Sequence, residues 1–160
     1  MSSKYCFGSI KWLEVKKTDE YIYLLSEFAV ASREYHNKNE MVFWKNSSLN
    51  GWLTTQFFSN SFSHNDKKRI EIISIPTIEQ ILDWFPKRQD RKCFATENAI
   101  KQGIELFSES GNTCAYWLQN TGRREGYSST VVRACGNIYS SAFMKAKNVG
   151  VRPYIIIKGY

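Results

Sequence analysis

The sequence lacks any apolar run of the roughly 20 residues that a membrane helix needs. Its opening residues, 1–6, lead into no apolar segment and no small-residue cleavage site, so we find no secretory signal. We therefore expect a cytoplasmic protein without a membrane partner.

Signatures of metal sites and of catalysis are also missing. The four cysteines are Cys6, Cys93, Cys114 and Cys135. None of them stands in a CxxC pair, which argues against a zinc site, and without an export signal we expect reduced thiols. The two histidines, His36 and His64, have no nucleophile or carboxylate at a recognisable spacing, and no Walker, Rossmann or zincin motif occurs. The sequence therefore predicts no metal, no cofactor and no catalytic residue.

What the chain has in quantity is aromatic side chains. Five Trp, nine Tyr and ten Phe make up 15% of its 160 residues, which is too rich a share for a disordered chain. The length fits one domain, residues 1–160, and suffices to bury a core without disulfides or metals.

Charge is unevenly distributed along the chain. Residues 1–84 hold ten Lys/Arg and ten Asp/Glu, whereas residues 85–160 hold twelve Lys/Arg and five Asp/Glu. The second half therefore carries the whole net charge of +7. This excess predicts either an anionic partner or a solvated basic surface that aids solubility.

The residue pattern predicts strands at both ends of the chain and helices between them. Residues 9–15 and 21–26 have strand composition and should pair as a hairpin, followed by a looser segment, 31–40. In the last third, we expect strands at 115–118, 129–134, 138–140 and 151–157, with turns at 120–122 and 136–137. The apolar run 154–157 predicts a strand that is buried on both faces.

Capping residues mark the predicted helices. The first helix begins at Ser47 or Ser48 and carries an apolar stripe of Leu49, Trp52, Leu53 and Phe57. The second covers 65–72, where Ser63 and Asp66 form a capping box. The third begins at Thr77, with Gln80 at the capping-box position, and ends at Pro86. A fourth, short helix begins near 96 and stops at Gly103. This order predicts an α+β domain with an antiparallel sheet, in which the first and last strands are neighbours.

Three motifs resemble an uncharacterised family of bacterial domains of unknown function. A tryptophan-led W..SSLR.WLN..F...AF segment is matched by Trp44, Ser47, Ser48, Leu49, Trp52, Leu53, Phe57, Ser61 and Phe62. A WWLRSPG segment is matched by Tyr116, Trp117, Leu118 and Gly122, and a GVRPAL segment by residues 150–153. More distantly, the chain is similar to C-type-lectin-like domains, a group that includes formylglycine-generating enzymes. The resemblance implies a C-type-lectin-like α+β fold with an antiparallel sheet, two to four short helices and irregular loops.

The chain departs from the family at Gln119, because residues 119–121 stand where the family has Arg-Ser-Pro. If that arginine contacts a ligand, the function has changed here; if it is structural, Gln119 hydrogen-bonds differently. Trp117 and Arg152 are predicted to be structural, since a buried guanidinium needs acceptors such as loop carbonyls or a carboxylate. Trp12, Trp44 and Trp52 are predicted core residues.

The sequence favours a non-enzymatic recognition domain that contacts a protein, glycan or anionic ligand through loops of residues 119–148. The candidate binding residues interleave cations with aromatics: Gln119, Arg123, Arg124, Tyr127, Arg133, Tyr139 and Lys145. The alternative function is nucleic-acid binding by the basic second half, although no RNP, KH or helix-turn-helix signature accompanies it. A third hypothesis is an oxidative enzyme that uses Cys114 or Cys135. Oligomeric state cannot be read from the sequence.

Overall fold

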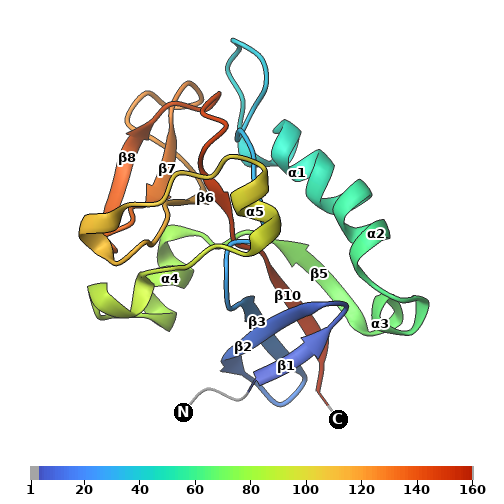
Figure 1. Ribbon diagram of the computed structural model, residues 1–160. Helices are drawn as coiled ribbons and strands as arrows, with labels where there is room; N and C mark the ends of the chain where they lie inside the picture. Colours follow the sequence, from blue (N-terminus) through green and yellow to red (C-terminus); the bar gives the residue numbers. More distant parts are fainter. Residues whose placement is uncertain (1–3, 160) are drawn as a thin grey trace.

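Two five-stranded sheets organise the domain (Figure 1). The computed structural model describes residues 4–159. The first sheet has the order β1-β2-β3-β10-β5. Its strands are β1 (Lys4–Phe7), β2 (Ile10–Lys17), β3 (Tyr21–Ser26), β10 (Tyr154–Lys158) and β5 (Ile70–Ser74). The second sheet has the order β4-β9-β6-β7-β8. Its strands are β4 (Ala31–Ser32), β9 (Gly150–Val151), β6 (Tyr116–Thr121), β7 (Ser129–Val132) and β8 (Ile138–Ala142).

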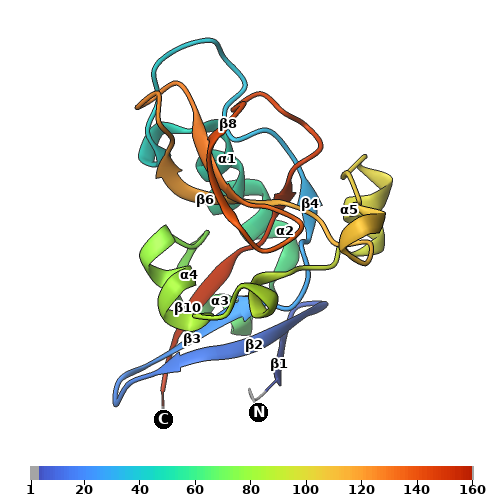
Figure 2. The ribbon, with the colours of Figure 1, turned by 90° about the vertical axis from the view of Figure 1, so that its left-hand side faces the viewer.

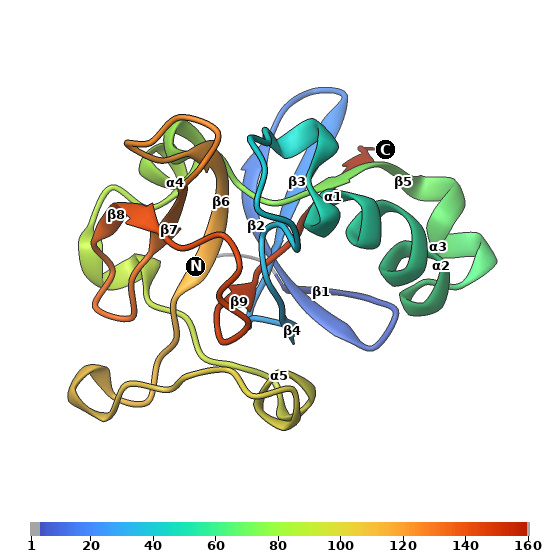
Figure 3. The same cartoon turned by 90° about the horizontal axis from the view of Figure 1, so that it is seen from above.

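The helices are short, and all of those described lie between β4 and β6 in the sequence. α1 (Ser48–Trp52), the π-helical turn η2 (Leu53–Phe57) and α2 (Phe58–Ser61) continue as one helix. The others are α3 (His64–Arg69), α4 (Ile78–Trp84) and α5 (Glu97–Lys101), with single turns η1 (Trp44–Asn46), η3 (Arg88–Arg91) and η4 (Ser108–Ser110). Seen from above, helix 48–61 and strands β6–β8 lie on opposite sides of β4 and β9 (Figure 3). The α+β class predicted from the sequence is confirmed.

Local side-chain chemistry starts these helices, as predicted. The Ser47 hydroxyl accepts a hydrogen bond from the amide of Asn50 at 3.1 Å. Complete capping boxes join Ser63 to Asp66 and Thr77 to Gln80. Each box satisfies backbone donors that the first helical turn leaves free.

The second predicted helix is wrong at its C-terminal end. α3 stops at Arg69, and Ile70 begins β5, which pairs with β10 through Ile156↔Ile72 and Ile155↔Ile73. β-branched side chains favour strands, and β10 offers an apolar partner edge that a sequence window cannot show. Tertiary pairing therefore overrides the helical continuation.

The hairpin β2–β3 is confirmed, with the register Trp12↔Ser26 and Leu13↔Leu25. The expectation that the first and last strands are neighbours is wrong, because β10 pairs with β3 and β5. β1, which the sequence analysis did not predict, extends the sheet beyond β2.

The expected strand 151–157 is two strands in different sheets, so the single-sheet expectation is also wrong. Val151 of β9 pairs with Ala31 of β4, and Gly150 pairs in parallel with Tyr116 of β6. β10 begins only after Pro153, whose missing N–H cannot continue a ladder. The chain therefore changes sheets at residues 152–153. Figure 2 shows β10 beside β3 of the first sheet. The four residues 154–157 are all buried, as predicted for a strand covered on both faces.

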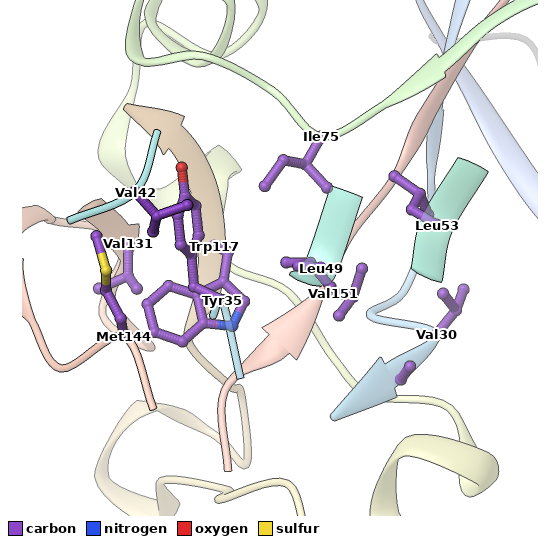
Figure 4. Close-up of a cluster of buried hydrophobic side chains, with 11 residues drawn as sticks. Val30, Tyr35, Val42, Leu49, Leu53, Ile75, Trp117, Val131, Met144 and Val151 are labelled. Carbon is purple, nitrogen blue, oxygen red and sulfur yellow. The ribbon is translucent and has the colours of Figure 1, made fainter. Parts of the chain in front are cut away.

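β6 separates two parts of the core, because alternate side chains of a strand point to opposite faces. Trp117 packs with Tyr35, Leu49 and Leu53 on one side (Figure 4). Tyr116 and Leu118 pack in a second cluster. The buried indole N–H of Trp117 also has a hydrogen-bond partner, because Nε1–H donates to the Arg33 carbonyl at 2.8 Å. Trp12 is fully buried in a third cluster, whereas Trp44 and Trp52 are half-buried against the first.

The guanidinium of Arg152 is 2% exposed and lies between the sheets. Its Nε donates to the carbonyl of Ser26 at 2.9 Å, and Nη2 donates to that of Glu27 at 3.3 Å. Its Nη1 donates to the Tyr116 hydroxyl at 3.2 Å, and the rings of Tyr116 and Phe85 lie 5.2 and 5.7 Å from its central carbon. One side chain thus connects the end of β3, in the first sheet, to β6 in the second.

We predict that Arg152→Met lowers the free energy of unfolding by about 2–4 kcal/mol, because it leaves buried carbonyls without donors. Arg123→Met is the matched control, since Arg123 is exposed, and should change stability by less than about 0.5 kcal/mol. Urea unfolding monitored by tryptophan fluorescence measures both. Equal stability of the two variants would contradict the role given to Arg152.

Two glycines should respond to alanine in opposite directions. A Cβ on Gly150 would lie 2.9 Å from the Ala115 carbonyl oxygen and 3.0 Å from the Ile104 side chain, so Gly150→Ala should cost about 1–3 kcal/mol. Gly51 lies within a helix with nothing near its missing Cβ, so Gly51→Ala should stabilise by about 0.5–1 kcal/mol. The same urea unfolding experiment measures the stability of both variants. Destabilisation by Gly51→Ala as well would contradict the placement of Gly51 in an exposed helical turn.

Candidate functional site

An open groove of about 420 Å³ runs along the β7–β8 hairpin, which stands at the edge of the second sheet (Figure 1). The groove contains the apolar side chains Val131, Ala142, Ala146 and Val149, the aromatic rings Phe107, Tyr139 and Phe143, and the polar residues Glu109, Arg133 and Cys135. Its volume lies in the usual range for small-molecule sites. It combines a mostly apolar lining with an exposed cation, Arg133.

The hairpin turn places the polar and aromatic residues of the groove. Gly136 has φ 93°, a left-handed conformation that favours glycine, and its N–H donates to the Arg133 carbonyl at 2.8 Å. The Arg133 N–H donates to the Asn137 carbonyl at 2.7 Å, which closes the turn between the strands. The turn predicted at 136–137 is confirmed. The pairing Val131↔Tyr139 then brings Tyr139 close to the end of β7.

Arg133 and Tyr139 form the electrostatic centre of the groove. The guanidinium carbon lies 5.1 Å from the centroid of the tyrosine ring, a cation–π distance. Both side chains are exposed; Tyr139 is 44% exposed, and the nearby Phe143 is 66% exposed. The arginine therefore keeps donors for an incoming anion, while the two rings offer flat apolar faces.

The other predicted binding residues lie elsewhere. Arg124 lies 5.9 Å from the ring centroid of Tyr127, in the loop between β6 and β7. Arg123 is exposed in the same loop, and its N–H donates to the Ser140 carbonyl at 2.7 Å. Lys145 is half-buried after β8 and is not among the residues that form the groove.

Gln119 faces the framework, away from the groove. Its Nε2 donates to the Ser74 hydroxyl at 2.9 Å and to the Ile75 carbonyl at 2.8 Å. The backbone carbonyl of Gln119 accepts a hydrogen bond from the Tyr35 hydroxyl at 2.7 Å. Burial raises the pKa of that hydroxyl. The amide therefore ties β6 to the end of β5.

A second exposed patch joins the loop 122–128 to the segment before η1. The Val42 N–H donates to the Gly126 carbonyl at 2.8 Å, and Met41, Phe43 and Tyr127 are all exposed around this bond. Sequence reasoning missed Met41 and Phe43 here, and Phe107 and Glu109 in the groove. No periodic pattern marks them, because they come from irregular segments whose exposure only the fold decides.

The cysteines are all free, and they lie in different environments. Cys6 is exposed, Cys135 is half-buried in the groove, and Cys93 and Cys114 are buried together. Cys114 has no exposed surface. His36 is structural: Nδ1 accepts from the Ser48 N–H at 3.0 Å, and Nε2 contacts Glu40 at 2.8 Å.

Over residues 4–159 no three His, Cys, Asp or Glu side chains gather closely enough to hold a metal ion. The helices within that part of the chain are also too short or too polar to cross a membrane.

Comparison with known proteins gives one match. No curated protein and no solved structure matches the chain. Residues 19–82, which run from the turn before β3 into α4, match the family described as Domain of unknown function (DUF6273). Over this part the chain is similar to an uncharacterised family of domains.

Proposed function

We propose that the protein is a non-enzymatic recognition domain whose β7–β8 groove binds an acidic glycan. The observation that carries the proposal is the pairing of the Arg133 guanidinium with the exposed Tyr139 ring in a concave, mostly apolar groove. A sugar ring has an apolar C–H face that packs on an aromatic ring, and a uronic acid adds a carboxylate that arginine binds through two donors.

The groove supports binding better than it supports chemistry. Its titratable groups are Glu109, Arg133, Cys135 and Tyr139, and no base–nucleophile hydrogen bond joins any two of them among the described contacts. The Glu109 carboxylate accepts a hydrogen bond from the neighbouring Ser108 hydroxyl at 3.4 Å. A recognition role needs neither a nucleophile nor a general base.

Nucleic-acid binding is the second candidate, and the placement of charge favours it less. Two cations of the basic half are used inside the fold: Arg152 is buried, and Arg91 donates to the carbonyls of Phe85, Pro86 and Gly136. Lys158, at the end of β10 in the first sheet, pairs with Glu71 at 3.4 Å. Among the described residues that line the groove, Arg133 is the one cation.

The proposal extends to architecture. The motif residues Trp44, Trp117 and Arg152 all lie in framework positions, which is what a C-type-lectin-like domain of the resembling bacterial family would need while its loops vary. We propose that architecture, with variable contacts in residues 119–148 and a cytoplasmic location, as part of the same hypothesis.

The test is an NMR titration of the labelled protein with methyl glucuronide and with the matching methyl glucoside. We expect the glucuronide to shift backbone amides near Arg133, Tyr139 and Phe143, and the neutral glucoside to bind at least about tenfold more weakly. Arg133→Gln should weaken glucuronide binding about tenfold or more and leave the glucoside unaffected.

Lys101→Gln is the matched control, because Lys101 is exposed on α5 and outside the groove. If neither sugar perturbs the groove, the glycan proposal fails. If a single-stranded oligonucleotide instead binds the groove with an affinity that falls steeply with salt, nucleic-acid recognition replaces it.

A further inference from the structure

Cys93 and Cys114 lie side by side in the core, on the side of β6 away from Trp117. The Cys114 N–H donates to the Cys93 carbonyl at 2.9 Å, and the Cys114 Sγ lies 3.5 Å from the same oxygen. With standard bond lengths, this backbone bond holds the two Cα atoms no more than about 6.8 Å apart, which is within the range of disulfides. The two thiols also interact with each other.

One buried guanidinium acts on this pair. The charge of Arg152 acts on both thiols, and its Nη1 donates to the hydroxyl of Tyr116, which packs in the same cluster as the two cysteines. Burial raises the pKa of the Cys93 thiol, but the hydrogen bond with Cys114 and the charge of Arg152 lower it by more, to about 7. The hydrogen bond to Cys93 and burial raise the pKa of Cys114. One sulfur is thus suited to attack as a thiolate, while the other keeps its proton.

We propose that Cys93 and Cys114 are a redox-modification site that forms a reversible intramolecular disulfide with hydrogen peroxide. The Cys93 thiolate attacks one peroxide oxygen, the O–O bond breaks, and Cys93 becomes a sulfenic acid as hydroxide leaves. This first hydroxide takes up the proton that the Cys93 thiol released and becomes water. The Cys114 sulfur then attacks the Cys93 sulfur, the S–O bond breaks, and the second hydroxide takes the Cys114 proton. Two thiols and one peroxide yield one disulfide and two waters.

Burial determines which oxidant this site accepts. Cys93 and Cys114 are 1% and 0% exposed, so a small peroxide reaches them more easily than a bulky disulfide such as oxidised glutathione. The new bond would close the segment 94–113, which holds α5 and η4 and contributes Phe107 and Glu109 to the groove. Disulfide formation does not depend on what the groove binds, so this proposal stands or fails separately from the glycan proposal.

The experiment treats the folded full chain with hydrogen peroxide and maps its peptides without reduction. We expect a cross-linked peptide that joins Cys93 to Cys114, the loss of two free thiols per chain, and full reversal by dithiothreitol. The oxidised protein should unfold at a temperature roughly 5–10 °C higher, because the closed loop restricts the unfolded chain. Oxidised glutathione should give little of the same product.

Substitutions identify the residues responsible. Cys93→Ser and Cys114→Ser should each abolish the cross-linked peptide, whereas Cys6→Ser, at an exposed thiol, should leave it unchanged. Peptide mapping of the unsubstituted protein keeps the test valid if a core variant fails to fold. The proposal is overturned if peroxide consumes Cys6 or Cys135 while Cys93 and Cys114 stay reduced, or if the only disulfides join separate chains.

Discussion

A single buried guanidinium couples the two sheets at the point where the chain passes between them. Arg152 follows β9 and precedes β10, and its donors reach the carbonyls that end β3 and the hydroxyl of Tyr116 on β6. Taking a guanidinium out of water is costly unless its donors find acceptors. The backbone around it must therefore keep its position, and the arrangement of β3, β6 and β10 depends on one side chain.

The same charge gives the two faces of β6 different properties. On one face, Trp117 and Tyr35 pack ring against ring, 5.7 Å between centroids, in a core that is chemically inert. On the other, Tyr116 lies with Cys93 and Cys114 in the field of Arg152, where a negative sulfur is stabilised. Arg152 thus joins the two sheets and also lowers the pKa of the Cys93 thiol. A substitution of Arg152 would therefore change both properties together.

The groove depends on this framework but lies outside it. β7 is buried along its whole length, whereas the hairpin turn and β8 reach solvent, so Arg133 and Tyr139 project from a fixed base. Gln119, which the sequence places among the binding candidates, is occupied by contacts to β5. A rigid strand pair that presents a few exposed polar and aromatic side chains is the usual arrangement for a recognition surface.

The sequence by itself determined the features that depend on neighbours a few residues away. The caps at Ser47, Ser63 and Thr77, the β2–β3 hairpin and the Gly136 turn follow from local hydrogen bonds and backbone preferences. Arg133 and Tyr139 were identified from the interleaving of cations with aromatics in the sequence. Only the tertiary structure decided what depends on distant partners. It turned residues 70–74 into a strand against β10, divided residues 150–158 between two sheets, and brought Cys93 to Cys114 and Phe107 to the groove. The physical reason is that strand pairing and core packing join segments far apart in the chain, and no local pattern records which segments will meet.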